Sequence, residues 1–226
     1  LITSWWGILG LIGWGYLVAA FVYLAAHDNI LNTVVAFLFF LSFNILSCLG
    51  LLTIFNPVKP LLGVIIEGNV PLIVISGLLT ALILKKMSVT SSSKAILTIV
   101  SIGVLSIAAG FLLRKWFIIS KIQATPSWGL ICNGISMIVF SLLYWITDVR
   151  KQIRWAFIFK PAGENSLTTY LAPDIIYYLI WMSNLPLLIY KQSDIPLIVI
   201  AGSLAWAFLM VGLTALLVRV NIRLKL

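Results

Sequence analysis

Asp174 lies inside a long apolar run, directly after Pro173. A charged side chain is costly within a bilayer and usually serves a ligand, an ion path or a partner charge. Because Pro173 has no N–H, the carbonyl of Thr169 loses its helical partner beside this carboxylate. Asp174 is therefore our candidate polar site residue. Its partner is either a polar ligand or a cation of a neighbouring helix, and the residues leave both interpretations open.

The segment that precedes it reads KPAGENSLTTY, from Lys160 to Tyr170. Asn165 or Ser166 is suited to cap the helix that should follow. Free N–H groups at a helix start also suit phosphate, and four basic residues lie close by: Arg150, Lys151, Arg154 and Lys160. A capped helix next to a positively charged loop explains the same residues without a ligand.

Cations and aromatic rings are combined between Arg114 and Trp128. Tryptophan commonly anchors the end of a membrane span, and Pro126 is well placed to open a helix. Such a surface could also stack a sugar ring and bind its acidic groups. An ordinary interfacial belt accounts for the pattern equally well.

His27 is the single histidine, and it shares a short joint with Asp28 and Asn29. A general base needs a cleft and a group that orients it, so we interpret His27 as a turn residue. Cys48 and Cys132 lie in apolar runs without a second cysteine or histidine at ligand spacing, which indicates packing roles and no metal site.

Seven apolar runs must position these groups. With 62% hydrophobic and 9% charged residues, and a mean hydropathy of +1.14, the chain cannot be a soluble domain. A bilayer admits helices of about 20 residues or closed barrels, and unbroken runs favour helices over alternating strands. We therefore expect an all-α polytopic bundle with spans at Trp5–Ala26, Ile30–Ile54, Val70–Leu84, Ala95–Leu113, Trp128–Ile146, Leu167–Tyr190 and Ile195–Val218.

The net charge of +9 comes from basic residues at span ends rather than along one stripe, so it indicates membrane topology and not nucleic-acid binding. Ten of them fall on one side: Lys85, Lys86, Lys94, Arg150, Lys151, Arg154, Lys160, Arg219, Arg223 and Lys225. The opposite side has Lys59, Arg114, Lys115, Lys121 and Lys191. The positive-inside rule predicts a cytoplasmic C-terminus and outer connections at Asn56–Asn69 and Arg114–Ser127.

Small residues predict where helices pack closely in lipid. The small-xxx-small spacing occurs at Ser106 with Gly110 and at Cys132 with Ser136, while Gly7, Gly10 and Gly13 recur at a spacing of three. We expect these positions to form contacts within the chain, with a homodimer seam as the alternative.

Two motifs resemble those of a known family. They are ISKIQATPSW, from Ile119 to Trp128, and WAFIFKPAGENSLTTYLAPDIIYY, from Trp155 to Tyr178, with the span GLICNGISMIVFSLLYWITDV between them. This part of the chain closely resembles the C-terminal half of the heparan-α-glucosaminide N-acetyltransferase family and its bacterial relatives. Its GENSLTTYL portion also looks like an element of a wider group of bacterial membrane acyltransferases.

The resemblance implies an inner-membrane enzyme that takes an acetyl group from cytoplasmic acetyl-CoA and delivers it to an amino sugar outside. The resemblance supplies only the motifs, and from our topology we infer that the CoA phosphates face Lys160, Gly163, Asn165, Ser166, Thr168 and Thr169. By the same inference, the sugar faces Lys121, Thr125 and Trp128.

One departure from the family concerns its essential histidine, which lies in the N-terminal half of its members. No histidine of this chain stands in a matching context. We therefore expect one transmembrane domain over residues 1–226, the C-terminal part of a longer protein, and expect it by itself to be inactive or only half a site. The alternatives are a transporter or flippase for a sugar or lipid-linked precursor, which would also use Pro173 and Asp174, and a structural membrane subunit.

Overall fold

The computed structural model describes residues 7–183 and 194–220, and within these ranges every regular element is a helix. Five of the helices are long and apolar enough to cross a bilayer. The expected all-α membrane bundle is confirmed, and the protein is an integral membrane protein.

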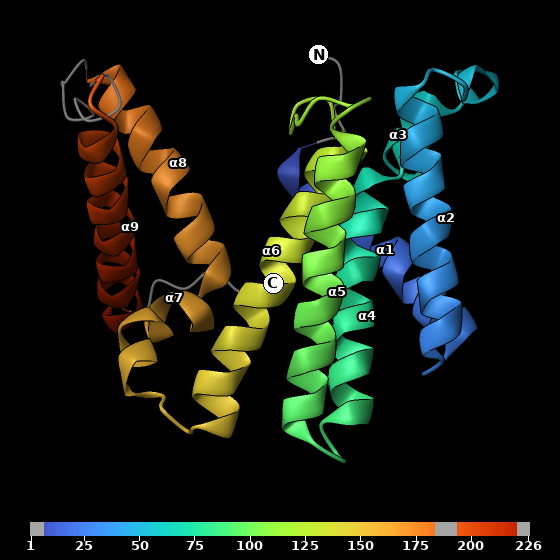
Figure 1. The fold of residues 1–226 in the computed structure, drawn as a ribbon. Coiled ribbons are helices and arrows are strands. Elements are labelled where there is room, and N and C mark those ends of the chain that lie inside the picture. The colour runs from blue at the N-terminus through green and yellow to red at the C-terminus, as the bar shows by residue number, and fades with distance from the viewer. Residues whose placement is uncertain (1–6, 184–193, 221–226) are drawn as a thin grey trace. The chain divides into compact units, whose positions relative to one another are not determined.

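The chain forms two compact units, Leu1–Lys151 and Gln152–Leu226, which are described separately. The first contains α1 (Ile8–Ala26), α2 (Ile30–Cys48), a 3₁₀ turn (Thr53–Phe55), α3 (Lys59–Glu67), α4 (Asn69–Met87), α5 (Ser92–Leu113), α6 (Pro126–Tyr144) and a π-helical turn (Trp145–Val149) (Figure 1). The second contains a 3₁₀ helix (Arg154–Phe159), α7 (Lys160–Glu164), α8 (Ser166–Met182) and α9 (Pro196–Arg219).

Five of the seven expected spans correspond to helices of spanning length, namely α2, α4, α5, α9 and α6 together with its π-helical turn. The apolar part of α1, Gly10–Ala26, is shorter, and α8 has 17 residues and runs through Pro173. Trp5, Tyr190, Lys191, Arg223 and Lys225 lie outside the described residues.

Two expectations for the region between the second and third spans were wrong. The second span ends at Cys48 rather than Ile54, because the chain turns at Gly50, whose φ of +72° belongs to the left-handed region. The Asn56–Asn69 segment is not a plain connection, since α3 occupies most of it. Pro60 lies in the first turn of α3, where its missing N–H costs nothing, and α3 buries Gly63, Val64 and Ile66.

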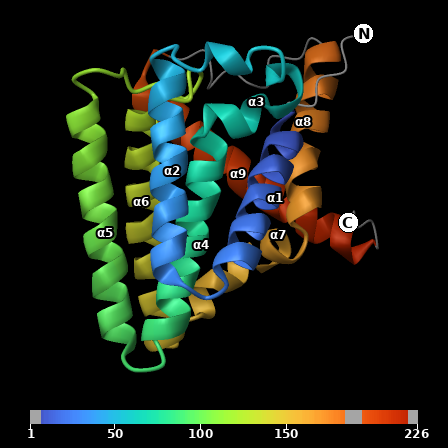
Figure 2. The ribbon, with the colours of Figure 1, turned by 90° about the vertical axis from the view of Figure 1, so that its right-hand side faces the viewer.

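Helix α4 is the centre of the first unit and contacts α1, α2, α5 and α6 (Figures 1 and 2). Toward its N-terminal half, Leu72 and Ile75 pack with Val18 of α1 and Phe40 of α2. Toward its C-terminal half, a second cluster contains Leu79, Ile83, Ile99 and Met137. Figures 1 and 2 show α3 and the α5–α6 loop at one end of this unit, and the α1–α2 joint and the α4–α5 turn at the other.

Helices α5 and α6 approach each other through glycine. A Cβ on Gly134 would collide with the carbonyl oxygen of Gly103, and a Cβ on Gly103 would lie 2.9 Å from the carbonyl oxygen of Gly134. A Cβ on Gly110 would lie 2.9 Å from the carbonyl oxygen of Ser127. Close backbone approach of this kind maximises van der Waals contact where lipid supplies no hydrophobic drive.

The small-residue expectations hold only in part. Ser106 and Gly110 do lie in the α5–α6 contact, where the Ser106 hydroxyl donates to the carbonyl of Leu130 at 2.8 Å. On α6 the partner is Gly134, whereas Ser136 is exposed. On α1, Gly15 packs against Val70 and Val74, while a Cβ on Gly7 or Gly13 would meet no atom within 4 Å.

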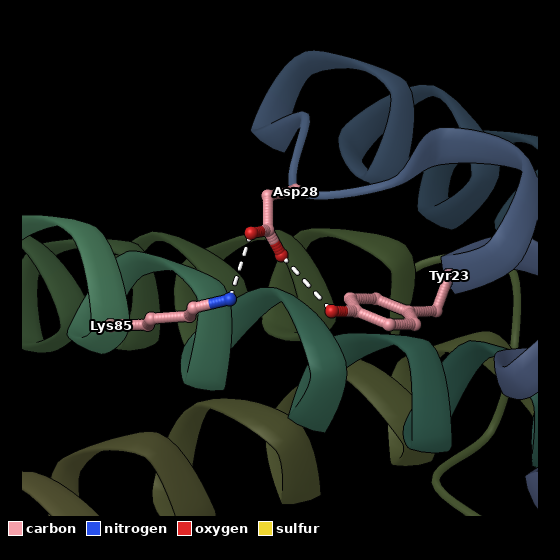
Figure 3. Close-up of polar contacts among 3 residues, drawn as sticks. All are labelled: Tyr23, Asp28 and Lys85. Carbon is pink, nitrogen blue, oxygen red and sulfur yellow. Dashed lines mark hydrogen bonds and ion pairs between the residues drawn. The ribbon is translucent and has the colours of Figure 1, made fainter.

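An ion pair joins the α1–α2 joint to the end of α4 (Figure 3). The Lys85 ammonium lies 2.7 Å from Asp28 Oδ2, and the Tyr23 hydroxyl donates to Asp28 Oδ1 at 3.2 Å. The hydrogen bond from Lys85 holds the pKa of Asp28 below its ordinary value of 3.8, and the hydrogen bond from Tyr23 acts in the same direction. His27 ends α1 at this joint with a φ of 49°, as an exposed turn residue.

In the second unit, α9 packs against α7 and α8. The rings of Tyr177 on α8 and Trp206 on α9 stack with centroids 4.7 Å apart. Nearer the start of α8, the hydroxyls of Thr169 and Thr214 lie 3.1 Å apart. Thr169 Oγ1 also reaches the carbonyl of Asn165, and Thr214 Oγ1 that of Met210. Two hydroxyls hold two protons, so at most two of these three contacts are hydrogen bonds at any moment.

Changing Gly134 to Ala should destabilise the protein by about 1–3 kcal/mol, because the new methyl group has no room against α5. The measurement is thermal unfolding in detergent, followed by circular dichroism. Gly13→Ala is the matched control. It also exchanges a helical glycine for alanine, but with open space around it, and should leave the midpoint unchanged or raise it. Equal midpoints for the two variants would contradict this account of the contact.

Asp28→Asn should lower the unfolding midpoint at pH 7 and lose its effect in acid. Because the folded state depresses the pKa of Asp28, the carboxylate stabilises the fold above pH 3.8, and this contribution is lost as the pH falls through the folded-state pKa. Both partners are exposed, so salt should reduce the effect. Glu67→Gln, at an exposed carboxylate without an ion pair to the described residues, is the control. A difference from wild type that persists at pH 2 would argue against the ion pair.

Candidate functional site

The loop between α5 and α6 is fixed by its own hydrogen bonds. The N–H of Ser120 donates to Thr125 Oγ1 at 3.1 Å, and the N–H of Thr125 donates to the carbonyl of Ser120 at 3.2 Å. The N–H of Gln123 donates to Ser120 Oγ at 3.2 Å. Ala124 has a positive φ of 49°, a strained conformation for a residue other than glycine. The expected aromatic and basic stretch is therefore an ordered loop.

Asn44 of α2 attaches this loop to the corner between α3 and α4. Its side chain is 1% exposed, and Nδ2 donates to the carbonyls of Glu67 and Ala124, each at 2.9 Å. Both carbonyls belong to segments where the chain leaves helical geometry, so neither has a regular partner. One buried amide thus satisfies two carbonyls that would be costly to leave unpaired.

Asn69 provides a second attachment of the α5–α6 loop, this time to α4. It begins α4 and is 2% exposed, and its Nδ2 donates to the carbonyl of Thr125 at 3.4 Å. Two glycines make room for these contacts. A Cβ on Gly129 would lie 2.9 Å from Asn69 Nδ2, and one on Gly68 would lie 2.6 Å from the carbonyl oxygen of Phe40. Gly68 also has a φ of +72°, which glycine adopts without strain.

Ser127 completes the attachment from within the first turn of α6. Its side chain is fully buried, and its hydroxyl lies 2.9 Å from the carbonyl of Ile118 and 3.2 Å from Thr125 Oγ1. The stretch of the loop from Ile118 to Ser127 is therefore held by side chains of α2, α4 and α6.

A cavity of about 400 Å³ opens beside this loop. Its lining combines two aromatic rings with amide and hydroxyl groups and comes from Cys48, Trp116, Phe117, Ile118, Gln123 and Thr125. Its volume is in the range of small-molecule sites. Trp116 is exposed, so its ring is available to a ligand.

The structure separates the three residues that we expected to bind sugar. Thr125 lines the cavity, but much of its hydroxyl's bonding capacity is used within the loop. Lys121 is exposed and Trp128 is half-buried, and neither belongs to the lining. Trp116 and Phe117, which belong to the same aromatic stretch, do line the cavity.

The residues expected to bind CoA lie in the second unit, around the junction of α7 and α8. Lys160 Nζ lies 3.8 Å from Glu164 Oε1, and both side chains are exposed. Gly163 is exposed and a Cβ there would meet no atom within 4 Å, so packing does not require glycine.

The cap that we expected at the start of α8 was wrong. Asn165 is at the N-cap position, but its amide donates backward to the carbonyl of Pro161 at 3.2 Å, and Ser166 is already the first residue of the helix. Thr168 is buried, and Thr169 contacts Thr214 of α9. Both threonines thus contribute to the interior of the second unit.

Asp174 is exposed on α8, next to the half-buried Pro173. It makes no hydrogen bond or ion pair with any residue in the two described ranges. The ion pair to a neighbouring helix, one of the two interpretations of this residue, is therefore not formed within this part of the chain.

Sequence reasoning missed Asn44 and Asn69, although a signal existed. Asn44 lies within an apolar run, where an unpaired amide is costly, so its presence there indicates a specific hydrogen-bond partner. The partner itself, a carbonyl of a residue 80 positions away, is defined by the tertiary fold.

The spanning helices and the ordered polar loop at one end of the first unit define an all-α integral membrane protein with a candidate small-molecule site. Comparison of the chain with models of protein families, with curated proteins and with solved structures finds no match.

Asn44→Asp should destabilise the protein by about 3 kcal/mol or more, since a buried carboxylate would then face two carbonyl oxygens without donors. Asn32→Asp is the control, because Asn32 is exposed on the same helix and should tolerate the change. Thermal unfolding in detergent measures both. Limited proteolysis between Ile118 and Thr125 should accelerate only in Asn44→Asp, and an unchanged cleavage rate would show that Asn44 does not hold this loop.

Proposed function

We propose that this chain is the membrane-embedded part of an acyltransferase that moves an acetyl group from acetyl-CoA to an amino sugar. The single observation that carries the proposal is the cavity beside the α5–α6 loop. That loop contains the ATPSW motif, one of the two motifs by which the chain resembles the N-acetyltransferase family. The expected topology has this end of the first unit on the outer face and the C-terminus in the cytoplasm of a bacterial inner membrane.

The lining of the cavity suits an amino sugar. The rings of Trp116 and Phe117 can cover the apolar face of a sugar, while the Gln123 amide can meet its hydroxyls. The loop is held by hydrogen bonds to buried side chains, so the binding surface is largely formed before the ligand arrives.

For acetyl-CoA the proposal relies on the second unit. Lys160, at the start of α7, and Arg154, at the start of the preceding 3₁₀ helix, are exposed cations and suit phosphate. Thr168 and Thr169 no longer belong to this assignment, since they pack within the unit.

A transporter or flippase is the second candidate. It is favoured by Asp174, an exposed carboxylate on a helix interrupted by proline and without an ion-pair partner among the residues described. A protein of this class should bind a sugar but ignore CoA.

Binding separates the two candidates, and it avoids the turnover that we do not expect from this chain by itself. The purified chain in lipid nanodiscs should bind acetyl-CoA and glucosamine in isothermal titration calorimetry. Trp116→Ala should weaken glucosamine binding about tenfold, equivalent to ~1.4 kcal/mol, and leave acetyl-CoA binding unchanged.

Trp145→Ala is the matched control, because this tryptophan is exposed but lies outside the cavity. Glucosamine binding without acetyl-CoA binding would reject the enzyme in favour of the transporter. If neither compound binds, both proposals fail and a structural membrane subunit is favoured.

A further inference from the structure

The two ends of the first unit differ in the character of their connections. At one end, the α1–α2 joint consists of His27, Asp28 and Asn29, and the α4–α5 turn has the sequence SVTS from Ser88 to Ser91. At the other end, residues 49–58 connect α2 to α3 without a single charged side chain. Connections that face water are normally polar, so the α2–α3 connection has a different environment.

This connection and the start of α3 expose large apolar side chains. Between residues 49 and 61 there are six of them, each 37% to 81% exposed: Leu49, Leu51, Ile54, Phe55, Val58 and Leu61. We call this group the α2–α3 apolar surface. Exposed apolar residues that are scattered singly need no explanation, but a concentration of them marks a surface that contacts a membrane or a partner.

The length of α2 places this surface at a boundary of the membrane. The helix has 19 residues and is therefore about 28 Å long, close to the ~30 Å thickness of the hydrocarbon core. Its start adjoins the exposed ion pair between Asp28 and Lys85, which belongs in contact with water. The end of α2 at Cys48 thus reaches the opposite boundary, and the α2–α3 apolar surface begins there.

The connection also extends in the direction of the lipid. Figure 1 shows it leaving the end of α2 sideways, on the side away from α5 and α6. Helix α3 then packs on α1, α2 and α4 and buries Gly63, Val64 and Ile66, while Leu61 stays exposed. A segment that leaves the helices sideways at this level adjoins the bilayer around α2.

Charge at this end of the first unit suits a phospholipid surface. Among the described residues of that end, Glu67 is the only carboxylate, whereas four residues are basic: Lys59, Arg114, Lys115 and Lys121. The last three are exposed, and none of the four forms an ion pair with a described residue. Basic side chains at a membrane boundary can reach lipid phosphates while their apolar neighbours enter the acyl region.

We propose that the α2–α3 apolar surface inserts into the boundary between headgroups and acyl chains and anchors this end of the first unit at that depth. The surface continues the lipid-facing side of α2, since Leu49 directly follows the last residue of that helix. Cys48 also lines the cavity beside the α5–α6 loop, so the anchor holds that cavity at the level of the headgroups. The inference is independent of acetyl transfer, because it uses no ligand assignment.

The test measures the surroundings of a nitroxide attached to Ile54→Cys. The whole chain, with Cys48→Ser and Cys132→Ser to remove other labelling sites, is placed in phosphatidylcholine nanodiscs. Power saturation in electron paramagnetic resonance compares relaxation by oxygen, which concentrates in the bilayer, with relaxation by a water-soluble nickel chelate. We expect a ratio of oxygen to nickel relaxation above one at Ile54.

Val89→Cys is the matched control. Val89 is 86% exposed and Ile54 81%, and both follow a spanning helix, but Val89 lies among serine, threonine and lysine. Its ratio should be below one. Leu105→Cys, in the middle of α5, gives the ratio for the membrane interior. Each labelled variant should keep the unfolding midpoint of the cysteine-free chain, which shows that the label has not disturbed the fold.

Two results would overturn the proposal. Relaxation dominated by nickel at Ile54 would place the surface in water. Low accessibility to both reagents would show that protein covers it, either a second copy of the chain or another partner. Leu61→Cys, on the exposed side of α3, repeats the measurement at a second position and should give the same result as Ile54→Cys. It decides the question if the Ile54 variant does not fold.

Discussion

Within a membrane protein every backbone carbonyl must be paired. This requirement determines how the chain is held at the end of the first unit that contains the candidate site. Where α3 meets α4, and where the α5–α6 loop meets α6, the chain leaves helical geometry and leaves carbonyls without regular donors. The amides of Asn44 and Asn69 supply those donors from neighbouring helices. The non-helical backbone is stable because these two side chains replace the missing helical hydrogen bonds, and the cavity beside the loop depends on the resulting shape.

Most of the helices were predictable from the sequence, because a run of apolar residues in a bilayer has almost no alternative to a helix. The helix boundaries were less predictable. Helix α3 was missed since its Lys59-Pro60 start and the Glu67-Gly68 end resemble a connection, and its burial becomes evident only when α1, α2 and α4 surround it. The early end of α2 depends on a turn at Gly50 that the apolar residues around it obscure.

The residues of the candidate site were likewise only partly predictable from the sequence. The aromatic stretch and Thr125 could be found by residue type, because rings and hydroxyls between two spans are visible in one segment of sequence. Cys48, from the end of another helix, could not, since only the fold brings it to the cavity. Thr168 and Thr169 show what residue type alone leaves open. Their hydroxyls suggested a ligand, but a hydroxyl on a helix also finds partners in its own backbone and on a neighbouring helix, as Thr169 does with Asn165 and Thr214.

The attachment made by Asn44 also orders the events of biosynthesis. Its two acceptors lie 23 and 80 residues further along the chain, at Glu67 and Ala124. When α2 enters the membrane, the fold has not yet brought either acceptor to it, so the Asn44 amide must use other partners until then. The first acceptor arrives with α3, and the second only after α5 has crossed. The loop beside the cavity therefore acquires its final form late, when almost the whole first unit is already inserted.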